Sequence, residues 1–243
     1  MLPYYLYTIF EANYLNPTPV GWHKFYAAVG LCITGKRRFF YYFHSMSTNK
    51  VAILIDGGFF LQRYKSINGN SPRIADMQPF INDVMVKVAA TTPSTTDILF
   101  RTYYYDCRPN GDTKVDPKGI TVDFSKHPQF YAANAFHADL RTFPQLALRL
   151  GELSFDGWKI DPKNPAAFVP DFKQKSVDIK LGLDIAWMSS KKTVDKLVLV
   201  AGDSDFVSPM KFARREGLLV YLYPMGQSQI KYVLKEHADF ILV

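Results

Sequence analysis

Two aspartates stand one residue apart directly after an apolar run, in the stretch "LVLVAGDSDFVSPM" at residues 197–210. Asp203 ends a predicted strand, and Asp205 enters the helix that follows it. Two like charges about 4 Å apart repel by on the order of 4 kcal/mol at an effective dielectric constant of about 20. A chain that keeps such a pair therefore needs a cation or a shared proton beside it.

Two further aspartates are expected to join this pair. Asp56 ends the apolar run "VAILID" and is followed by Gly57 and Gly58, which let the backbone turn sharply. Asp178 lies in the first turn of a helix predicted over residues 176–190. Because an open parallel sheet binds its ligands beyond the carboxyl ends of the strands, we expect these carboxylates to meet at one edge of the sheet.

The donor atoms of this cluster are all oxygens, with no histidine or thiolate nearby, and oxygen ligands suit Mg²⁺ or Mn²⁺. Such an ion can polarise a phosphate and activate a bound water for in-line attack on a phosphodiester. The structural alternative is that each aspartate separately caps a helix or turns the chain. Their joint placement favours one metal-binding and catalytic cluster, made of Asp56, Asp178, Asp203 and Asp205.

Strand-length apolar runs alternate with helical patterns from residue 51 onwards, which is typical of an α/β fold with a mainly parallel central sheet. Strands are predicted over 51–56, 97–106, 155–160, 196–203 and 218–224, and helices over 74–91, 176–190, 206–217 and 228–239. Turn-forming residues predict a loop and helix insertion over 107–150 and a polar loop over 161–175.

The composition fits a protein of the cytoplasm. Its 243 residues are 48% hydrophobic, enough for one well-buried core, and the net charge of +7 is compatible with nucleic-acid binding. Two cysteines, Cys32 and Cys107, are too few for a disulfide framework and lack metal-ligand spacing, which favours a reducing compartment. No apolar run reaches the roughly 18 to 20 residues that cross a bilayer, so we expect no membrane partner.

The first 45 residues differ from the rest in being rich in aromatic residues without a sustained period. Because "MSTNK" follows directly, we interpret Met46 as the natural initiator and residues 1–45 as an upstream extension with little structure, ahead of a domain over 46–243. The alternative is an aromatic, basic arm that docks on the domain or on single-stranded nucleic acid.

Three blocks of the chain resemble, in order and spacing, the motifs of NYN domains, a branch of the PIN-like nuclease superfamily: "VAILIDGGFF", "KSVDIKLGLDIAWM" and "DKLVLVAGDSDFVSPMKFARREGLLVYLY". The resemblance covers residues 50–240. It implies a Rossmann-like three-layer sandwich with strand order near 3-2-1-4-5. It also implies an acidic pocket for a divalent metal, and RNA as the partner that is cleaved or processed.

Carried over motif by motif, the resemblance puts the four aspartates named above on the metal-site positions and Ser204 where it can contact a phosphate. Asp184 falls on a commonly acidic position. Since it lies six residues after Asp178 on a helix, it should point away from Asp178 and brace the loops. Many NYN domains carry an asparagine shortly after the first strand's aspartate, whereas this chain reads "DGGFF", so one plausible metal or phosphate ligand is missing.

Other polar residues lie near the expected cluster. Lys175 and Lys180 flank Asp178 and are candidate phosphate ligands, although they could equally form a solvated face. Asp106 also ends a predicted strand, and we group it as supporting with Asp184, Gly57 and Gly58.

Taken together, the sequence predicts a Mg²⁺- or Mn²⁺-dependent ribonuclease that hydrolyses RNA phosphodiester bonds. The first alternative is a non-catalytic RNA-binding or regulatory module with the same fold. The second is a phosphotransfer enzyme with an aspartate nucleophile, but that class usually has paired aspartates after the first strand, and here the pair comes late. The sequence leaves a homo-oligomer open.

Overall fold

The computed structural model describes residues 27–33, 36–42, 48–93 and 96–243. The chain divides into two compact units, residues 1–47 and 48–243. In the first unit, β1 (Ala27–Ile33) pairs antiparallel with β2 (Lys36–Tyr42). The other residues of the predicted extension lie outside the described residues, and its assignment as an upstream extension stays a prediction.

The second unit is built on a seven-stranded sheet with the order β11-β10-β9-β3-β4-β7-β8. All neighbouring strands are parallel except β7 and β8. Numbered along the chain, the five parallel strands from β7 to β10 have the order 3-2-1-4-5, which confirms the predicted fold class. The strands are β3 (Thr48–Asp56), β4 (Thr96–Arg108), β7 (Leu146–Asp161), β8 (Asn164–Lys175), β9 (Lys196–Val200), β10 (Leu219–Leu222) and β11 (Phe240–Ile241).

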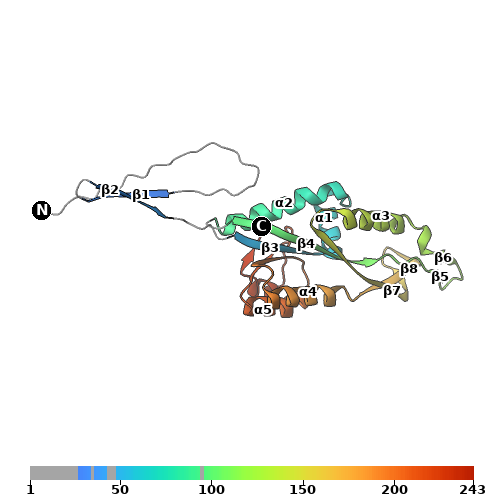
Figure 1. Cartoon of the computed structure of the whole chain (residues 1–243). Coiled ribbons are helices and arrows are strands. Elements are labelled where there is room, and N and C mark those ends of the chain that lie inside the picture. Colours follow the sequence, from blue (N-terminus) through green and yellow to red (C-terminus); the bar gives the residue numbers. More distant parts are fainter. Residues whose placement is uncertain (1–26, 34–35, 43–47, 94–95) are drawn as a thin grey trace. The chain divides into compact units, whose positions relative to one another are not determined.

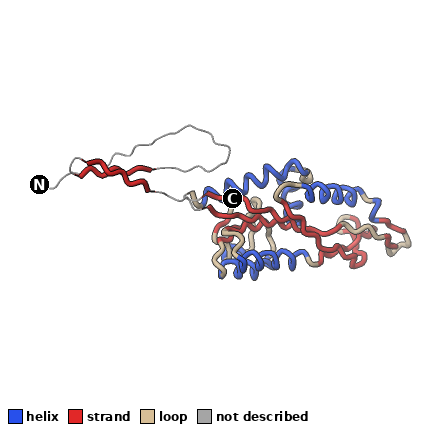
Figure 2. The backbone as a smooth tube through the Cα atoms, viewed as in Figure 1, coloured by secondary structure: helices blue, strands red, loops and turns tan. Residues whose placement is uncertain are grey.

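Helices cover both faces of this sheet, which gives the three layers seen in Figures 1 and 2. One face carries α1 (Gly57–Asn68), α2 (Ile74–Thr91) and α3 (Pro128–Thr142), and the other carries α4 (Val177–Lys191) and α5 (Val207–Arg215). A short α6 (Tyr232–Glu236) and two 3₁₀ turns, Phe124–Lys126 and Ser204–Phe206, complete the helices of this unit, and β5 (Thr113–Val115) pairs with β6 (Thr121–Asp123). None of the helices in the described part of the chain is long and apolar enough to cross a membrane.

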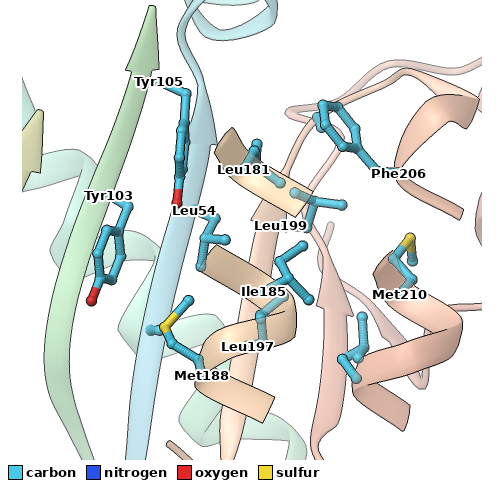
Figure 3. Close-up of a cluster of buried hydrophobic side chains, with 14 of the residues drawn as sticks. Leu54, Tyr103, Tyr105, Leu181, Ile185, Met188, Leu197, Leu199, Phe206 and Met210 are labelled. Carbon is cyan, nitrogen blue, oxygen red and sulfur yellow. The ribbon is translucent and has the colours of Figure 1, made fainter. Parts of the chain in front are cut away.

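The central strands are buried on both faces, as parallel strands between helices must be. Every residue from Val51 to Ile55 of β3 is fully buried, and so is every residue from Leu197 to Val200 of β9. Alternate side chains enter two separate cores, with Leu54 on the α4 side and Ile53 on the α2 side. Figure 3 shows the α4 side, where the sheet residues Leu54, Tyr105, Leu197 and Leu199 meet Leu181, Ile185, Met188 and Met210 of the helices.

The prediction for residues 146–175 was wrong in its elements. Instead of a short strand and a polar loop, β7 and β8 form a long antiparallel hairpin. An edge hairpin that is solvated over much of its surface tolerates the polar residues and prolines that indicated a loop. Aromatic packing of Phe155, Trp158 and Phe172 with Phe124 stabilises it instead of a regular apolar alternation.

A charged pair lies inside the opposite, amino-terminal end of the sheet. The side chains of Lys196 and Asp97 are each 1% exposed, and their Nζ and Oδ1 atoms are 2.7 Å apart. Lys196 also donates to the Thr92 hydroxyl and lies 5.9 Å from the Tyr221 ring centroid. This end of β9 therefore depends on two buried charges that compensate each other.

Candidate active site

Asp56 is held at the junction of β3 and α1. Its carboxylate caps α1 by accepting the Phe59 N–H at 3.3 Å. The helix can begin directly after the strand because residue 57 is glycine: a Cβ there would lie 2.5 Å from the Tyr105 carbonyl oxygen. Gly58 leaves room for the Gln174 amide, since its Cβ would lie 3.2 Å from that nitrogen. The two glycines thus allow a charged cap at the carboxyl end of a central strand.

Asp203 and Asp205 follow β9, the strand next to β3, so they lie at the same edge of the sheet. Asp203 caps the 3₁₀ turn by accepting the Asp205 N–H at 3.3 Å. Lys231 lies above this turn, with its Nζ 3.5 Å from an Asp203 oxygen and donating to Ser204 Oγ at 2.9 Å. An ammonium group therefore offsets part of the negative charge of this loop.

Asp178 is the second residue of α4, which begins directly after Ser176, and the left-handed backbone of Ser176 (φ 68°) turns the chain out of β8. Burial raises the pKa of Asp178, and the nearby charges of Asp205 and Asp203 raise it further. This mutual repulsion shows that the helix start and the loop after β9 share one electrostatic environment.

Asp56 is also subject to like-charge repulsion. Burial raises the pKa of this carboxyl to about 6, and the charges of Asp178 and Asp106 add to the rise, although the Phe59 and Gly58 N–H groups oppose it. At this sheet edge the charge of Asp178 thus raises the pKa of Asp56, and the charges of Asp203 and Asp205 raise the pKa of Asp178. Groups with such perturbed pKa values are typical of functional sites.

The four carboxylates match a hard divalent cation in the chemistry of their donors. Among the described residues, no group of three or more His, Cys, Asp or Glu side chains is arranged to hold a metal ion. Mg²⁺ commonly takes only one or two protein carboxylates and completes its shell with water and substrate phosphates, so a closed cage of side chains is not required. The donor set fits such an ion as an open site.

The two other candidate aspartates have separate partners. Asp106, at the carboxyl end of β4, accepts the Cys107 N–H at 2.7 Å and lies 2.9 Å from Nε2 of the buried His137. Asp184 accepts from the Tyr105 hydroxyl at 2.9 Å and from Arg149 Nε at 3.0 Å. Asp106 therefore adjoins Asp56 through its charge, whereas Asp184 ties α4 to β4 and β7.

The candidate phosphate ligands are also separated. Lys180 donates to the Leu150 carbonyl and lines a second hollow beside Asp184. Lys175 is exposed at the end of β8, opposite Glu152. Only Ser204 of the three lies directly beside a site aspartate, with its hydroxyl bound to Lys231.

A pocket of about 490 Å³ adjoins the aspartates and contains residues that the sequence analysis missed. It is lined by Asp56, Gly58, Phe59, Gln62, Arg63, Ser66, Gln174, Gly202, Asp203, Gln227 and Lys231. The basic and amide residues come from α1, β8 and the segment after β10. Gln174 brings a carboxamide next to Asp56 from a different strand, where the loop after β3 lacks an asparagine.

The raised pKa of Asp56 leads to a stability prediction. The folded protein binds a proton on Asp56 more tightly than the unfolded chain does, so protonation stabilises the fold. This contribution to the free energy of unfolding is full below pH 3.8 and is lost as the pH rises through about 6. The change is about 3 kcal/mol. In the Asp56→Asn variant the side chain can still accept the Phe59 N–H that caps α1, but it carries no negative charge. In EDTA it should be more stable than the native protein by up to about 3 kcal/mol at about pH 7.5 and equal to it near pH 4.

Urea unfolding at both pH values measures this difference. Asp139→Asn, at an exposed position of α3, is the matched control and should leave both values unchanged. A stability of Asp56→Asn that tracks the native protein across the whole pH range would show that the Asp56 charge costs nothing in the fold.

Residues 100–243 match the NYN domain family. No curated protein is significantly similar to the chain. Among solved structures, a protein of unknown function from Vibrio parahaemolyticus is 18% identical, covers 82% of this chain and 93% of its own, and has a TM-score of 0.46. The spore cortex-lytic enzyme SleL of Bacillus megaterium is 11% identical, covers 87% and 45%, and has a TM-score of 0.21.

Proposed function

The chain belongs to the NYN domain family, whose members are nuclease-like and act on RNA, and from this membership we propose that it is a metal-dependent ribonuclease. In this proposal Asp56, Asp178, Asp203 and Asp205 form the active site and hydrolyse RNA phosphodiester bonds. We propose the cytoplasm as the site of action, because RNA is present there as substrate. The buried free thiol of Cys107 also fits a reducing compartment.

One observation carries the proposal: Asp56 and Asp203 line one pocket at the carboxyl edge of the sheet, and the charge of Asp178 raises the pKa of Asp56 while the charges of Asp205 and Asp203 raise that of Asp178. Gathering like charges costs free energy, and a fold without a use for them would separate them or pair each with a base. Of the four, Asp203 is the one with an ion-pair partner in the described part of the chain, and that pair with Lys231 is exposed to solvent, which weakens it. The cluster thus keeps a negative potential that favours a cation.

Asp56, Asp178, Asp203 and Asp205 are the residues that would hold Mg²⁺ or Mn²⁺. When bound, such an ion supplies a Lewis acid that polarises the phosphate and makes water more acidic. Burial raises the pKa of Asp56 to about 6 in the absence of an ion, and a bound cation would favour its ionised form. In this proposal Ser204 and Lys231, which donates to Ser204 Oγ beside Asp203, contact a phosphate oxygen of the RNA.

Metal removal tests the function. The purified protein should cleave a mixture of single-stranded RNAs in Mg²⁺ or Mn²⁺, lose this activity in excess EDTA, and regain it when excess metal is restored. The products are followed on denaturing gels, with the same fractions from cells without the gene as the control. Metal-independent RNA binding without any cleavage would replace the ribonuclease by the non-catalytic RNA-binding module.

A further inference from the structure

The pocket beside the aspartates is lined by groups of both charges and by carboxamides. Asp56 and Asp203 contribute negative charges, and Arg63 and Lys231 contribute positive charges, with Lys231 Nζ 3.5 Å from an Asp203 oxygen. The three carboxamides belong to Gln62, Gln174 and Gln227. Its volume of about 490 Å³ is within the usual range for small-ligand sites, about 300 to 1,000 Å³. A ligand that matches this lining carries an anionic group and a part that forms hydrogen bonds with carboxamides.

Arg63 is fixed in place before any ligand arrives. Its Nη2 and Nε donate to the Met225 carbonyl oxygen at 2.9 and 3.3 Å. No ion pair links Arg63 to a carboxylate within the described ranges of the chain, and the guanidinium has five N–H groups in all. Donors that remain on its outer edge can therefore serve an anion.

The turn that holds Arg63 is itself constrained. Met225 has a left-handed backbone with φ 48°, followed by Gly226 with φ 68°, and the Gln227 N–H closes the turn on the Pro224 carbonyl at 3.0 Å. A non-glycine residue in this conformation costs on the order of 1 kcal/mol, which the surrounding structure must offset. The turn aims one carbonyl at Arg63 and places the side chain of Gln227 in the pocket.

The charged residues that line the pocket favour one orientation of a bound anionic ligand. An anion is repelled by Asp56 and Asp203 unless a cation covers them, so its favoured place in the pocket is against Arg63 and Lys231. Arginine binds phosphate in a bidentate manner, and carboxamides both donate to and accept from the edges of bases. These properties match a nucleotide, with its phosphate bound by the basic side chains and its base bound by the carboxamides.

We propose that this pocket binds one unpaired nucleotide of the RNA strand, with a phosphate on Arg63 and Lys231 and the base among the three carboxamides. The proposal rests on the proposed function, because it takes the neighbouring phosphodiester at the aspartates as the one that is cut. A base in a duplex is stacked and paired and cannot enter a pocket, so the site selects single-stranded RNA.

The test measures binding in EDTA, where cleavage does not interfere. Fluorescence anisotropy is recorded with the full chain and a labelled RNA of about 12 nucleotides, single-stranded or annealed to its complement. We expect the single strand to bind at least about 10-fold more tightly than the duplex. Arg63→Ala should weaken single-strand binding about 10- to 100-fold and lower the salt slope by about 1.

Lys65→Ala is the matched control, because it removes a positive charge from an exposed position of the same helix that does not line the pocket. It should change the affinity less than about 3-fold. Lys231→Gln should weaken binding as Arg63→Ala does. The Lys231 side chain is exposed, so we expect this variant to keep its fold. Thermal melts of each variant check that the fold is kept.

Equal weakening by Arg63→Ala and Lys65→Ala, or equal affinity for the single strand and the duplex, would overturn the nucleotide pocket whatever the cleavage assay shows. Loss of binding in Arg63→Ala and Lys231→Gln, with preference for the single strand in the native protein, supports it. If that pattern appears but no metal-dependent cleavage is found, the pocket stands and the ribonuclease function fails.

Discussion

Replacing Asp203 by asparagine is expected to lower the rate of metal-dependent RNA cleavage at least about 100-fold, while the protein stays folded. The substitution removes one negative charge from the cluster and keeps the shape of the side chain. Asparagine can still accept the Asp205 N–H that closes the 3₁₀ turn, so the loop after β9 keeps its conformation. Initial rates with a quencher-labelled single-stranded RNA and a thermal melt measure the two parts of this prediction.

Asp139→Asn provides the control for that experiment, since it makes the same chemical change at an exposed position of α3. Its cleavage rate should equal that of the native protein. If Asp203→Asn cuts RNA as fast as the native protein, the observed activity belongs to a contaminant or to another site, and the four-aspartate site would have to be abandoned.

The second large effect concerns stability. Asp97→Ala should lower the free energy of unfolding by about 3 to 5 kcal/mol, because it leaves the ammonium of Lys196 buried without its counter-charge. For a chain of this length that corresponds to a fall in melting temperature of roughly 6 to 20 °C. Urea unfolding of the native and variant proteins at neutral pH gives the free energy directly.

The double variant Asp97→Leu/Lys196→Met is the control, because it removes both charges and fills their volume with apolar groups. Replacement of a buried ion pair by apolar residues is often neutral or stabilising, so the double variant should recover most of the loss. A double variant that is as unstable as Asp97→Ala would mean that packing at this site, and not the unpaired charge, accounts for the effect.

The sequence by itself determined the central part of the sheet. The runs that end at Asp56 and Asp203 are apolar throughout because both faces of these strands are buried, and that pattern can be recognised without any neighbour. The order of the strands followed from the family resemblance and is the one observed. Since strands of one parallel sheet end at the same edge, the meeting of these aspartates could also be predicted.

Only the tertiary structure decided what surrounds those carboxylates. Gln174 lies near Asp56 because it belongs to an edge hairpin, whose proline and polar residues predicted a loop. Arg63 lies on α1, a helix that the sequence analysis did not identify. Lys180 is next to Asp178 in sequence but donates to a carbonyl of β7. A strand that is buried on both faces can be recognised from its own apolar residues. The partners of an exposed polar side chain depend on contacts between segments far apart in the chain, which no local pattern records.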